Sequence, residues 1–275
     1  MKQEPVLYES HMHTPLCKHA KGQPEEYAAV AEKRGLKGII VTCHNPVVDG
    51  WAARYRMDLQ QFPDYVAMVG RARQKWAGRV DVRLGMESDY YPGAEAWLAE
   101  LHQKADFNHI LGSVHSPLPE YQKLYYNGSV DGYFRTHFEH LADAAETGLF
   151  DTLAHPDLVK IAEPKAWSLS RLLDDVRRSL DRIAATGVAM ELNTSGLNKV
   201  LAEWHPSPEF LAEMRQRDIP VVIGADAHEP GRVAANYEEA LRLLRKVGYS
   251  HVSQFINRQR QDVEIGIALA SLKAA

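Results

Sequence analysis

The chain has few cysteines and no long apolar run. Only Cys17 and Cys43 occur among 275 residues, which excludes a disulfide-stabilised scaffold and favours reduced thiols. The amino-terminal segment MKQEPVLYESHMH lacks the apolar core of a signal peptide, and no segment approaches the ~20 apolar residues of a membrane span. We therefore expect a cytoplasmic protein with no membrane partner.

An excess of positive charge is also absent. Lysine and arginine total 32 against 36 acidic residues, a net charge of −4, and the isoelectric point is about 6.4. This balance argues against a general electrostatic attraction to nucleic acid or to anionic membranes. Any anionic ligand must be held by a local group of side chains. The abundant residue is histidine, which occurs thirteen times.

Length and composition favour one globular domain over residues 1–275. Hydrophobic residues make up 45% of the chain and charged residues 25%, as in ordinary globular proteins. An α/β barrel of ~250 residues commonly forms a single domain. No flexible linker divides the chain, and its longest irregular stretches, residues 45–57, 116–132 and 195–207, read as loops over a site.

Short β-rich segments alternate with longer segments of helical periodicity, a pattern typical of βα units and a largely parallel sheet. The predicted strands are Val6–Ser10, Gly38–Thr42, Val80–Met86, His109–Val114, Phe150–Ala154, Val188–Leu192 and Pro220–Gly224. The predicted helices are Pro24–Arg34, Tyr65–Trp76, Tyr133–Thr147, Ser168–Thr186 and Tyr237–Val247. Ser168 is a plausible helix N-cap, while Gly187 and Gly248 are stop signals.

Polar side chains follow every predicted strand. Parallel α/β folds carry their ligand site at the carboxyl ends of the strands. The residues at those ends are His11, His13, Cys43, His44, Glu87, His115, His155, Asn193, Asp226 and His228. Residues i and i+2 of extended chain point to one face, so His11 pairs with His13 and Asp226 with His228. Each pair forms a chelate.

Imidazole and carboxylate groups are ligands that suit zinc, manganese and iron. With His19 from the first loop, the rim offers seven histidines, Glu87 and Asp226. These are more ligands than a single ion can bind. We therefore predict two or three divalent metal ions at this rim. The other histidines have no partners there and are expected on the surface or in the core: His102, His109, His137, His140, His205 and His251.

The cysteines allow another interpretation of the first loop. Cys17, His19, Cys43 and His44 are the right residue types for one structural zinc ion, but their spacing matches no common zinc knuckle. The alternative is that both cysteines are small, partly buried residues beside the site.

Six motifs in chain order then identify a family resemblance: HMHTPLCKHAKGQPEEYAAVAEKRGLKGIIVTCHNP, GMESDYYPG, LGSVH, GLFDTLAHPDLVK, ELNTSGLNK and GADAHEP. Along nearly its whole length the chain resembles the PHP (polymerase and histidinol phosphatase) superfamily, and most closely the monofunctional histidinol-phosphatase branch. The resemblance implies an α/β fold, a distorted (βα)7 TIM-like barrel, with a trinuclear metal centre at the carboxyl ends of its strands.

Carried over motif by motif, the resemblance fills all nine ligand positions of the superfamily. It assigns a first ion to His11, His13, Glu87 and Asp226, a second to Glu87, His115 and His155, and a third to His19, His44 and His228. Two positions depart from the family. Cys43 stands where an aspartate is common, and Asn198 stands where the phosphatase branch has arginine in its GLRK motif.

The predicted function is metal-dependent hydrolysis of a small phosphate monoester, foremost L-histidinol phosphate to L-histidinol and phosphate in histidine biosynthesis. A hydroxide that bridges two ions is the expected nucleophile. Glu87, Asp226 and His228 would surround it as ligands, and the general acid is not assigned. The candidate substrate contacts are Lys160, Lys199 and Arg232 for phosphate, with Glu120, Glu191 and Asn193 for the organic part.

Two other functions remain open at this point. A phosphoesterase of the same superfamily acts on nucleotides, nucleoside bisphosphates or DNA 3′ ends, although the acidic isoelectric point disfavours nucleic acid as a partner. A non-catalytic metal-binding module is the second. The oligomeric state is not indicated by the sequence.

Overall fold

The computed structural model describes residues 4–273, and its strands follow one another across the sheet in chain order. Each strand up to β8 pairs in parallel with the next, while β8 and β9 form an antiparallel hairpin. The strands are β1 Tyr8–Glu9, β2 Gly38–Val41, β3 Asp81–Asp89, β4 His109–Ser113, β5 Thr152–Leu153, β6 Ala189–Asn193, β7 Val221–Gly224, β8 His251–Ile256 and β9 Gln259–Glu264.

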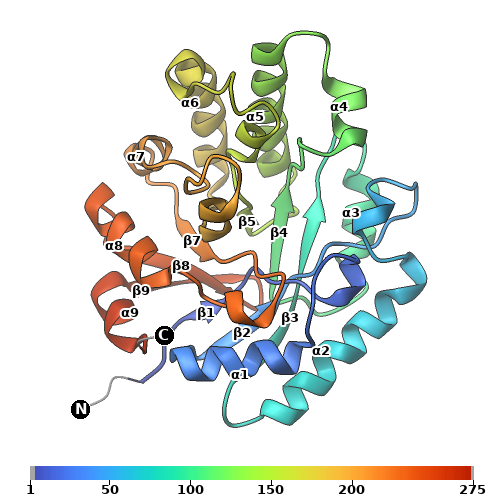
Figure 1. Ribbon diagram of the computed structural model, residues 1–275, viewed down its shortest axis with the longest axis vertical. Coiled ribbons are helices and arrows are strands. Elements are labelled where there is room, and N and C mark those ends of the chain that lie inside the picture. The colour runs from blue at the N-terminus through green and yellow to red at the C-terminus, as the bar shows by residue number, and fades with distance from the viewer. Residues whose placement is uncertain (1–3, 274–275) are drawn as a thin grey trace.

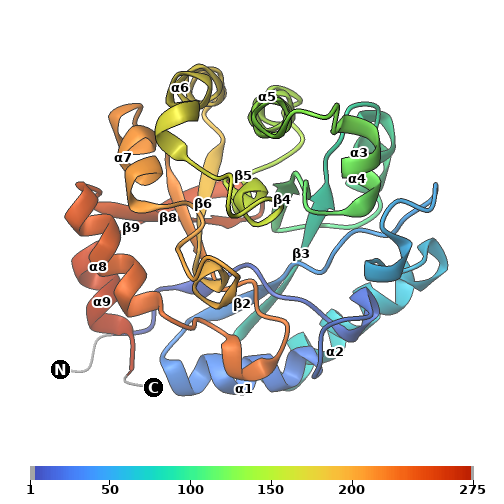
Figure 2. The ribbon, with the colours of Figure 1, turned by 45° about the horizontal axis from the view of Figure 1, so that its top comes forward.

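All seven predicted strands are present, and the prediction missed β8 and β9. Helices surround the strands on all sides (Figures 1 and 2), as in a barrel of βα units. The helices are α1 Pro24–Arg34, α2 Phe62–Trp76, α3 Glu95–Leu101, α4 Pro119–Tyr125, α5 Val130–Glu146, α6 Leu169–Thr186, α7 Pro208–Gln216, α8 Tyr237–Val247 and α9 Ile265–Ser271. Among residues 4–273, no helix combines the length and apolar character needed to cross a bilayer.

The first strand of the sheet contacts different strands at its two ends, which distorts the barrel. At the carboxyl ends of β1 and β7, the backbone of Ala227 accepts from His13 N–H at 2.9 Å and donates to His11 at 3.0 Å. At the amino ends, β8 lies beside β7, and its Gln254 side chain accepts from the backbone N–H of Tyr8 at 3.2 Å. The strands therefore converge where the predicted ligands lie.

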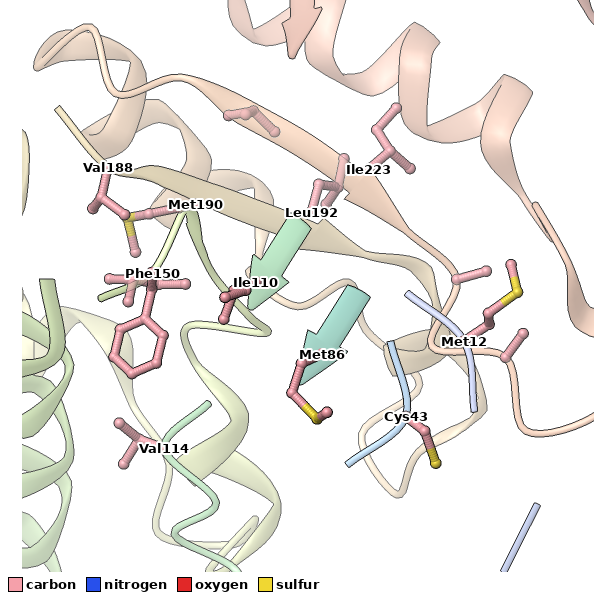
Figure 3. Packing of buried hydrophobic residues seen from close by; sticks show 14 of the residues in the cluster. Met12, Cys43, Met86, Ile110, Val114, Phe150, Val188, Met190, Leu192 and Ile223 are labelled. Atoms are coloured by element: carbon pink, nitrogen blue, oxygen red, sulfur yellow. The ribbon is translucent and has the colours of Figure 1, made fainter. Parts of the chain in front are cut away.

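Alternation along the strands separates a helix-facing layer from the barrel interior. Met190 and Leu192 of β6, and Val188 just before the strand, belong to the large apolar cluster (Figure 3). Since successive side chains of a strand point to opposite faces, Glu191 points into the barrel. The same period on β3 places Met86 in the apolar layer and Glu87 inside.

The floor of the interior is a small packed layer. Ala189, Val222 and Phe255 form a separate buried cluster, and the ring of His109 stacks on Phe255 at 5.1 Å. His109 is therefore a core histidine, as expected. A filled floor leaves the opposite, carboxyl end of the barrel as the place for a ligand.

The helix signals are mostly confirmed. Helix α1 has the predicted bounds, and α6 and α8 end at Gly187 and Gly248, whose φ angles are 75° and 106°. Glycine adopts these left-handed angles without a Cβ penalty. Ser168 precedes α6, but its hydroxyl contacts Ser170 Oγ instead of capping the helix backbone.

One predicted loop was wrong. Residues 116–132 contain the short helix α4, which begins at Pro119, a favourable first helical residue. Its Tyr121 is fully buried and its hydroxyl forms a 2.7 Å hydrogen bond with His140 Nδ1, so this tyrosine packs against α5. Only Tyr126 of the three tyrosines in the segment is a largely exposed ring.

Candidate metal centre

Glu87 lies at the centre of the nine predicted ligands. Its side chain is fully buried, and five imidazoles from four segments of the chain surround it. Oε2 lies 2.7 Å from His44 Nδ1, 3.4 Å from His11 Nε2 and 3.6 Å from His13 Nε2. Oε1 lies 3.1 Å from His155 Nε2 and 3.3 Å from His115 Nε2. The predicted bridging carboxylate thus contacts candidate ligands of more than one ion.

Asp226 completes the group predicted for the first ion. Its Oδ1 lies 3.0 Å from His13 Nε2 and 3.6 Å from His11 Nε2. Asp226 has a φ of 48° and His155 a φ of 28°, angles that L-residues rarely adopt. Such backbone strain concentrates at functional sites.

A separate group of imidazoles lies nearer the surface. The Nε2 atoms of His19 and His228 are 2.9 Å apart, and together with His44 they offer nitrogens within 4.8 Å of one another. This trio is the one that the resemblance assigns to the third ion. The structure therefore brings all nine predicted ligands to one rim.

Unpartnered buried atoms test whether these residues fit a metal ion. His11 Nε2, His44 Nδ1 and Glu87 Oε2 are buried and have no hydrogen-bond partner within residues 4–273. His44 Nδ1 and Glu87 Oε2 lie 2.7 Å apart without the geometry of a hydrogen bond. Buried polar groups in folded proteins are almost always paired. Divalent cations fit this donor set, because they satisfy such lone pairs together.

The far nitrogen of several imidazoles is held by a protein acceptor. His11 Nδ1 contacts Glu191 Oε1 at 2.6 Å, and His115 Nδ1 contacts Asp89 Oδ1 at 2.7 Å. His19 Nδ1 and His228 Nδ1 lie 2.7 and 3.0 Å from backbone carbonyls. Hydrogen bonds of this kind fix the tautomer and orientation of metal-binding histidines. In each case Nε2 is left to face the centre.

Charge in the centre follows from these contacts. Burial alone would raise the pKa of Glu87, but His44, His11 and His115 hold it well below its ordinary value. Burial lowers the pKa of His13 to about 3. Both side chains are therefore in the forms that bind metal, carboxylate and neutral imidazole, near neutral pH.

The cysteines contribute less to the centre than the histidines. Both are buried and free. Cys43 Sγ faces Thr14 and accepts from its backbone N–H at 3.4 Å and its hydroxyl at 3.2 Å. Cys17 lies within ligand reach of His13 and His228. The alternative zinc set of the first loop is therefore not favoured, because Cys43 is engaged elsewhere.

A cavity of about 610 Å³ opens above the centre. Six of the nine candidate ligands line it: His19, His44, His115, His155, Asp226 and His228. Apolar side chains form another part of its wall: Pro117, Leu118, Pro119, Leu158 and Ile161. Two cations, Arg56 and Lys199, also face the cavity. The space thus combines a polar floor, an apolar wall and basic side chains suited to an anionic ester.

Of the six candidate substrate contacts, only Lys199 is among the residues that line this cavity. Lys160 is fully buried, and its Nζ donates to Asp157 at 2.9 Å, to Glu203 at 2.9 Å and to the Trp204 carbonyl at 2.6 Å. A saturated ammonium has no donor left for phosphate. The structure therefore places Lys160 in a supporting network.

Asn193 and Glu191 also lie beneath the site. The Asn193 amide donates to Glu191 Oε2 at 3.0 Å, while its Oδ1 accepts from Ser195 N–H at 2.9 Å. Both side chains are fully buried. Arg232 and Glu120 likewise do not line the cavity. These four residues are not placed for direct contact with a ligand there.

Gly224 permits the close packing under the centre. A Cβ at this position would lie 1.9 Å from Glu191 Oε1 and 2.7 Å from His11 Cβ. No side chain fits between them, so glycine lets β7 approach the pair that orients His11.

The sequence reasoning missed Arg56 and Asp89. Asp89 lies two residues beyond Glu87 on β3, so its position on the same face was a usable signal. No such signal in the sequence marks Arg56, because it comes from an irregular segment and contacts Asp89 only in the folded chain. Its guanidinium forms two 2.7 Å hydrogen bonds with Asp89.

The fold and the rim together define an α/β-barrel protein with a divalent-metal centre. Comparison with known proteins makes this more specific, since residues 9–195 match the family model described as PHP domain. The chain belongs to the PHP domain family. The resemblance inferred from the motifs is thereby confirmed.

Curated relatives span nearly the whole chain. A "Probable histidinol-phosphatase" of Deinococcus radiodurans is 38% identical over 261 residues, which cover 93% of this chain and 98% of that protein. The "Histidinol-phosphatase" of Bacillus subtilis is 25% identical and covers 85% and 97%. The chain therefore falls among the histidinol-phosphatase-like members of the family.

A solved structure confirms the fold class. The histidinol phosphate phosphatase of Lactococcus lactis, crystallised with zinc, L-histidinol and phosphate, superposes with a TM-score of 0.77. The match covers 94% of this chain and 99% of that one at 17% sequence identity. At this identity the likeness establishes the fold.

Proposed function

We propose that this protein is a metal-dependent phosphatase that hydrolyses L-histidinol phosphate to L-histidinol and phosphate, the reaction expected from the sequence. Its relatives named histidinol-phosphatase support the class of enzyme, phosphoric monoester hydrolase. The proposal includes one domain over residues 1–275 and a cytoplasmic location in histidine biosynthesis.

The observation that carries the proposal is the convergence of nine ligand-type side chains around Glu87 beneath an open cavity. We assign two or three divalent ions to this rim, grouped as the resemblance implies. When bound, such ions neutralise charge on a phosphoryl group and lower the pKa of water. Attack by a hydroxide between two ions remains a prediction.

The protein's own residues have defined tasks in this proposal. Glu191, Asp89 and two backbone carbonyls orient the imidazoles. Lys199 faces the cavity and contributes positive charge for phosphate. The apolar wall of prolines, Leu158 and Ile161 suits the organic part of a small ester.

The direct test is phosphate release from L-histidinol phosphate by purified protein before and after metal removal. Protein stripped with a chelator should lose activity, and zinc, manganese or iron(II), added separately, should restore it to different extents. Activity that survives stripping, with metal content verified to be near zero, would rule out the proposed metal-dependent mechanism.

Lys199→Met should weaken substrate binding more than turnover. The lysine is exposed at the cavity, and an exposed charge contact contributes about 1 kcal/mol or less. We expect KM for L-histidinol phosphate to rise about three- to fivefold with little change in kcat. Steady-state kinetics measure both constants.

Asn198→Arg provides the matched opposite change. It restores the arginine of the GLRK motif beside Lys199, and a guanidinium binds phosphate with two hydrogen bonds. KM should fall in this variant. A lower KM in Lys199→Met would contradict the assignment of Lys199 to phosphate binding.

A further inference from the structure

The segment of residues 45–57 brings a buried arginine to the metal centre. Arg56 is only 2% exposed. Its Nε donates to Asp89 Oδ2 and its Nη2 to Asp89 Oδ1, both at 2.7 Å. The two parallel hydrogen bonds of this fork hold both carboxylate oxygens and stop the carboxylate plane from rotating.

Asp89 passes this constraint to a candidate ligand. Its Oδ1 lies 2.7 Å from His115 Nδ1, while His115 Nε2 lies 3.3 Å from Glu87 Oε1. Arg56 Nη2 itself is 3.2 Å from His115 Nδ1. A continuous chain of contacts therefore runs from Arg56 through Asp89 and His115 to Glu87.

We propose that Arg56 is a positioning residue, which fixes Asp89 and through it aims His115 Nε2 at the second proposed metal ion. This inference rests on the proposed function of the site. In this inference Arg56, which is not one of the nine candidate ligands, sets the orientation of the ligand His115. Partners of this kind typically change metal affinity 10- to 100-fold when they are removed.

The contacts of Arg56 favour positioning over direct binding of phosphate. Its Nε and Nη2 are directed at Asp89 and its Nη1 donates to the Tyr55 carbonyl at 2.9 Å. A guanidinium engaged on each nitrogen is held rigidly. Lys199, by contrast, is exposed beside the cavity and is free to move toward a ligand.

The same segment has an independent attachment, which separates positioning from simple anchoring. Tyr91 donates to Asp49 Oδ2 at 2.6 Å, and its ring stacks on Trp51 at 4.0 Å. These contacts fasten the segment without touching His115. Tyr91→Phe is therefore a matched control, since it loosens the segment and leaves the contacts of Arg56 in place.

The test measures zinc binding and kinetics in Arg56→Met, Arg56→Lys, Asp89→Asn and Tyr91→Phe. Stripped proteins are titrated with zinc against a chromophoric chelator, and kcat and KM are measured with L-histidinol phosphate. In Arg56→Met we expect the affinity of one zinc ion to fall 10- to 100-fold and kcat to fall with a smaller change in KM. Asp89→Asn should behave alike, Arg56→Lys should recover part of both, and Tyr91→Phe should match the wild type.

Wild-type zinc affinity in Arg56→Met would overturn the inference. So would equal losses in Arg56→Met and Tyr91→Phe, because anchoring of the segment would then explain both. If Arg56→Met does not fold, Arg56→Lys and Asp89→Asn carry the test through the same zinc titration. If the wild type binds zinc but does not hydrolyse L-histidinol phosphate, the proposed function fails, while the zinc titration still decides the role of Arg56.

Discussion

Glu87→Gln should lose phosphatase activity almost completely while the protein remains folded. Glutamine keeps the shape of the side chain but removes the charge that five imidazoles surround. Metal ions supply several kcal/mol of stabilisation to the transition state, so loss of their shared ligand should lower kcat/KM by about 10³-fold or more. Phosphate release and metal analysis of the same sample measure the effect.

The matched control for this variant is Glu32→Gln. Glu32 pairs with Arg79 on the surface at 2.6 Å, and the same change there should leave activity and metal content as in the wild type. Near wild-type activity in Glu87→Gln, with unchanged metal content, would show that Glu87 is not the central ligand of the catalytic metals.

Asp157→Asn should strongly lower the free energy of unfolding. Asp157 is fully buried and accepts from Lys160 at 2.9 Å and from Ser207 N–H at 3.0 Å, while His205 Nδ1 lies 2.8 Å away. Removal of one partner leaves the Lys160 ammonium buried with less compensation, which costs about 3 kcal/mol. Urea unfolding of stripped protein gives the free energy directly.

Asp181→Asn is the control for that measurement. Asp181 pairs with Arg217 at 2.6 Å but its side chain is 65% exposed, so the change should cost about 0.5 kcal/mol or less. Equal free energies of unfolding for Asp157→Asn and Asp181→Asn would show that the buried network does not stabilise the fold.

The pH dependence of stability should differ between the wild type and Asp157→Asn. Burial alone would raise the pKa of Asp157, but Lys160 and His205 lower it to about 2, below the unfolded value of about 3.9. A lowered folded pKa adds stability that is complete above the unfolded pKa and is lost as the pH falls through the folded one. The stability difference between the two proteins should therefore shrink from pH 4 to pH 2. A difference that stays constant over this range would contradict the lowered pKa.

Much of the fold was predictable because its signals are local. Hydrophobic runs mark the parallel strands. The residue after each run lies at the carboxyl rim because all these strands point the same way, so its position does not depend on contacts with distant segments. Strand β9 escaped prediction because its sequence, QRQDVE, is mostly exposed and polar and is a strand only through pairing with β8. Helix α4 escaped because its seven residues are too few to show a clear period.

The candidate site also has a part that local sequence signals indicate and a part that they do not. The candidate ligands were predictable from strand position and from motifs, whereas the substrate contacts were not. Lys160 looked available in the sequence, but Glu203 and Trp204 reach it from more than forty residues away. Arg56 looked like an ordinary loop arginine until folding brought it to Asp89. Contacts between distant segments decide which polar residues are free to bind a ligand.

The most direct measurement of the proposed function is the kcat/KM of the zinc-loaded protein for L-histidinol phosphate beside a nucleoside monophosphate, a nucleoside bisphosphate and a short 3′-phosphorylated DNA. We predict that L-histidinol phosphate is preferred by at least about 100-fold, which corresponds to about 2.7 kcal/mol of transition-state discrimination. A higher kcat/KM for a nucleotide or for DNA would contradict the proposed substrate. No hydrolysis of any of the four would contradict the proposal that the centre is catalytic.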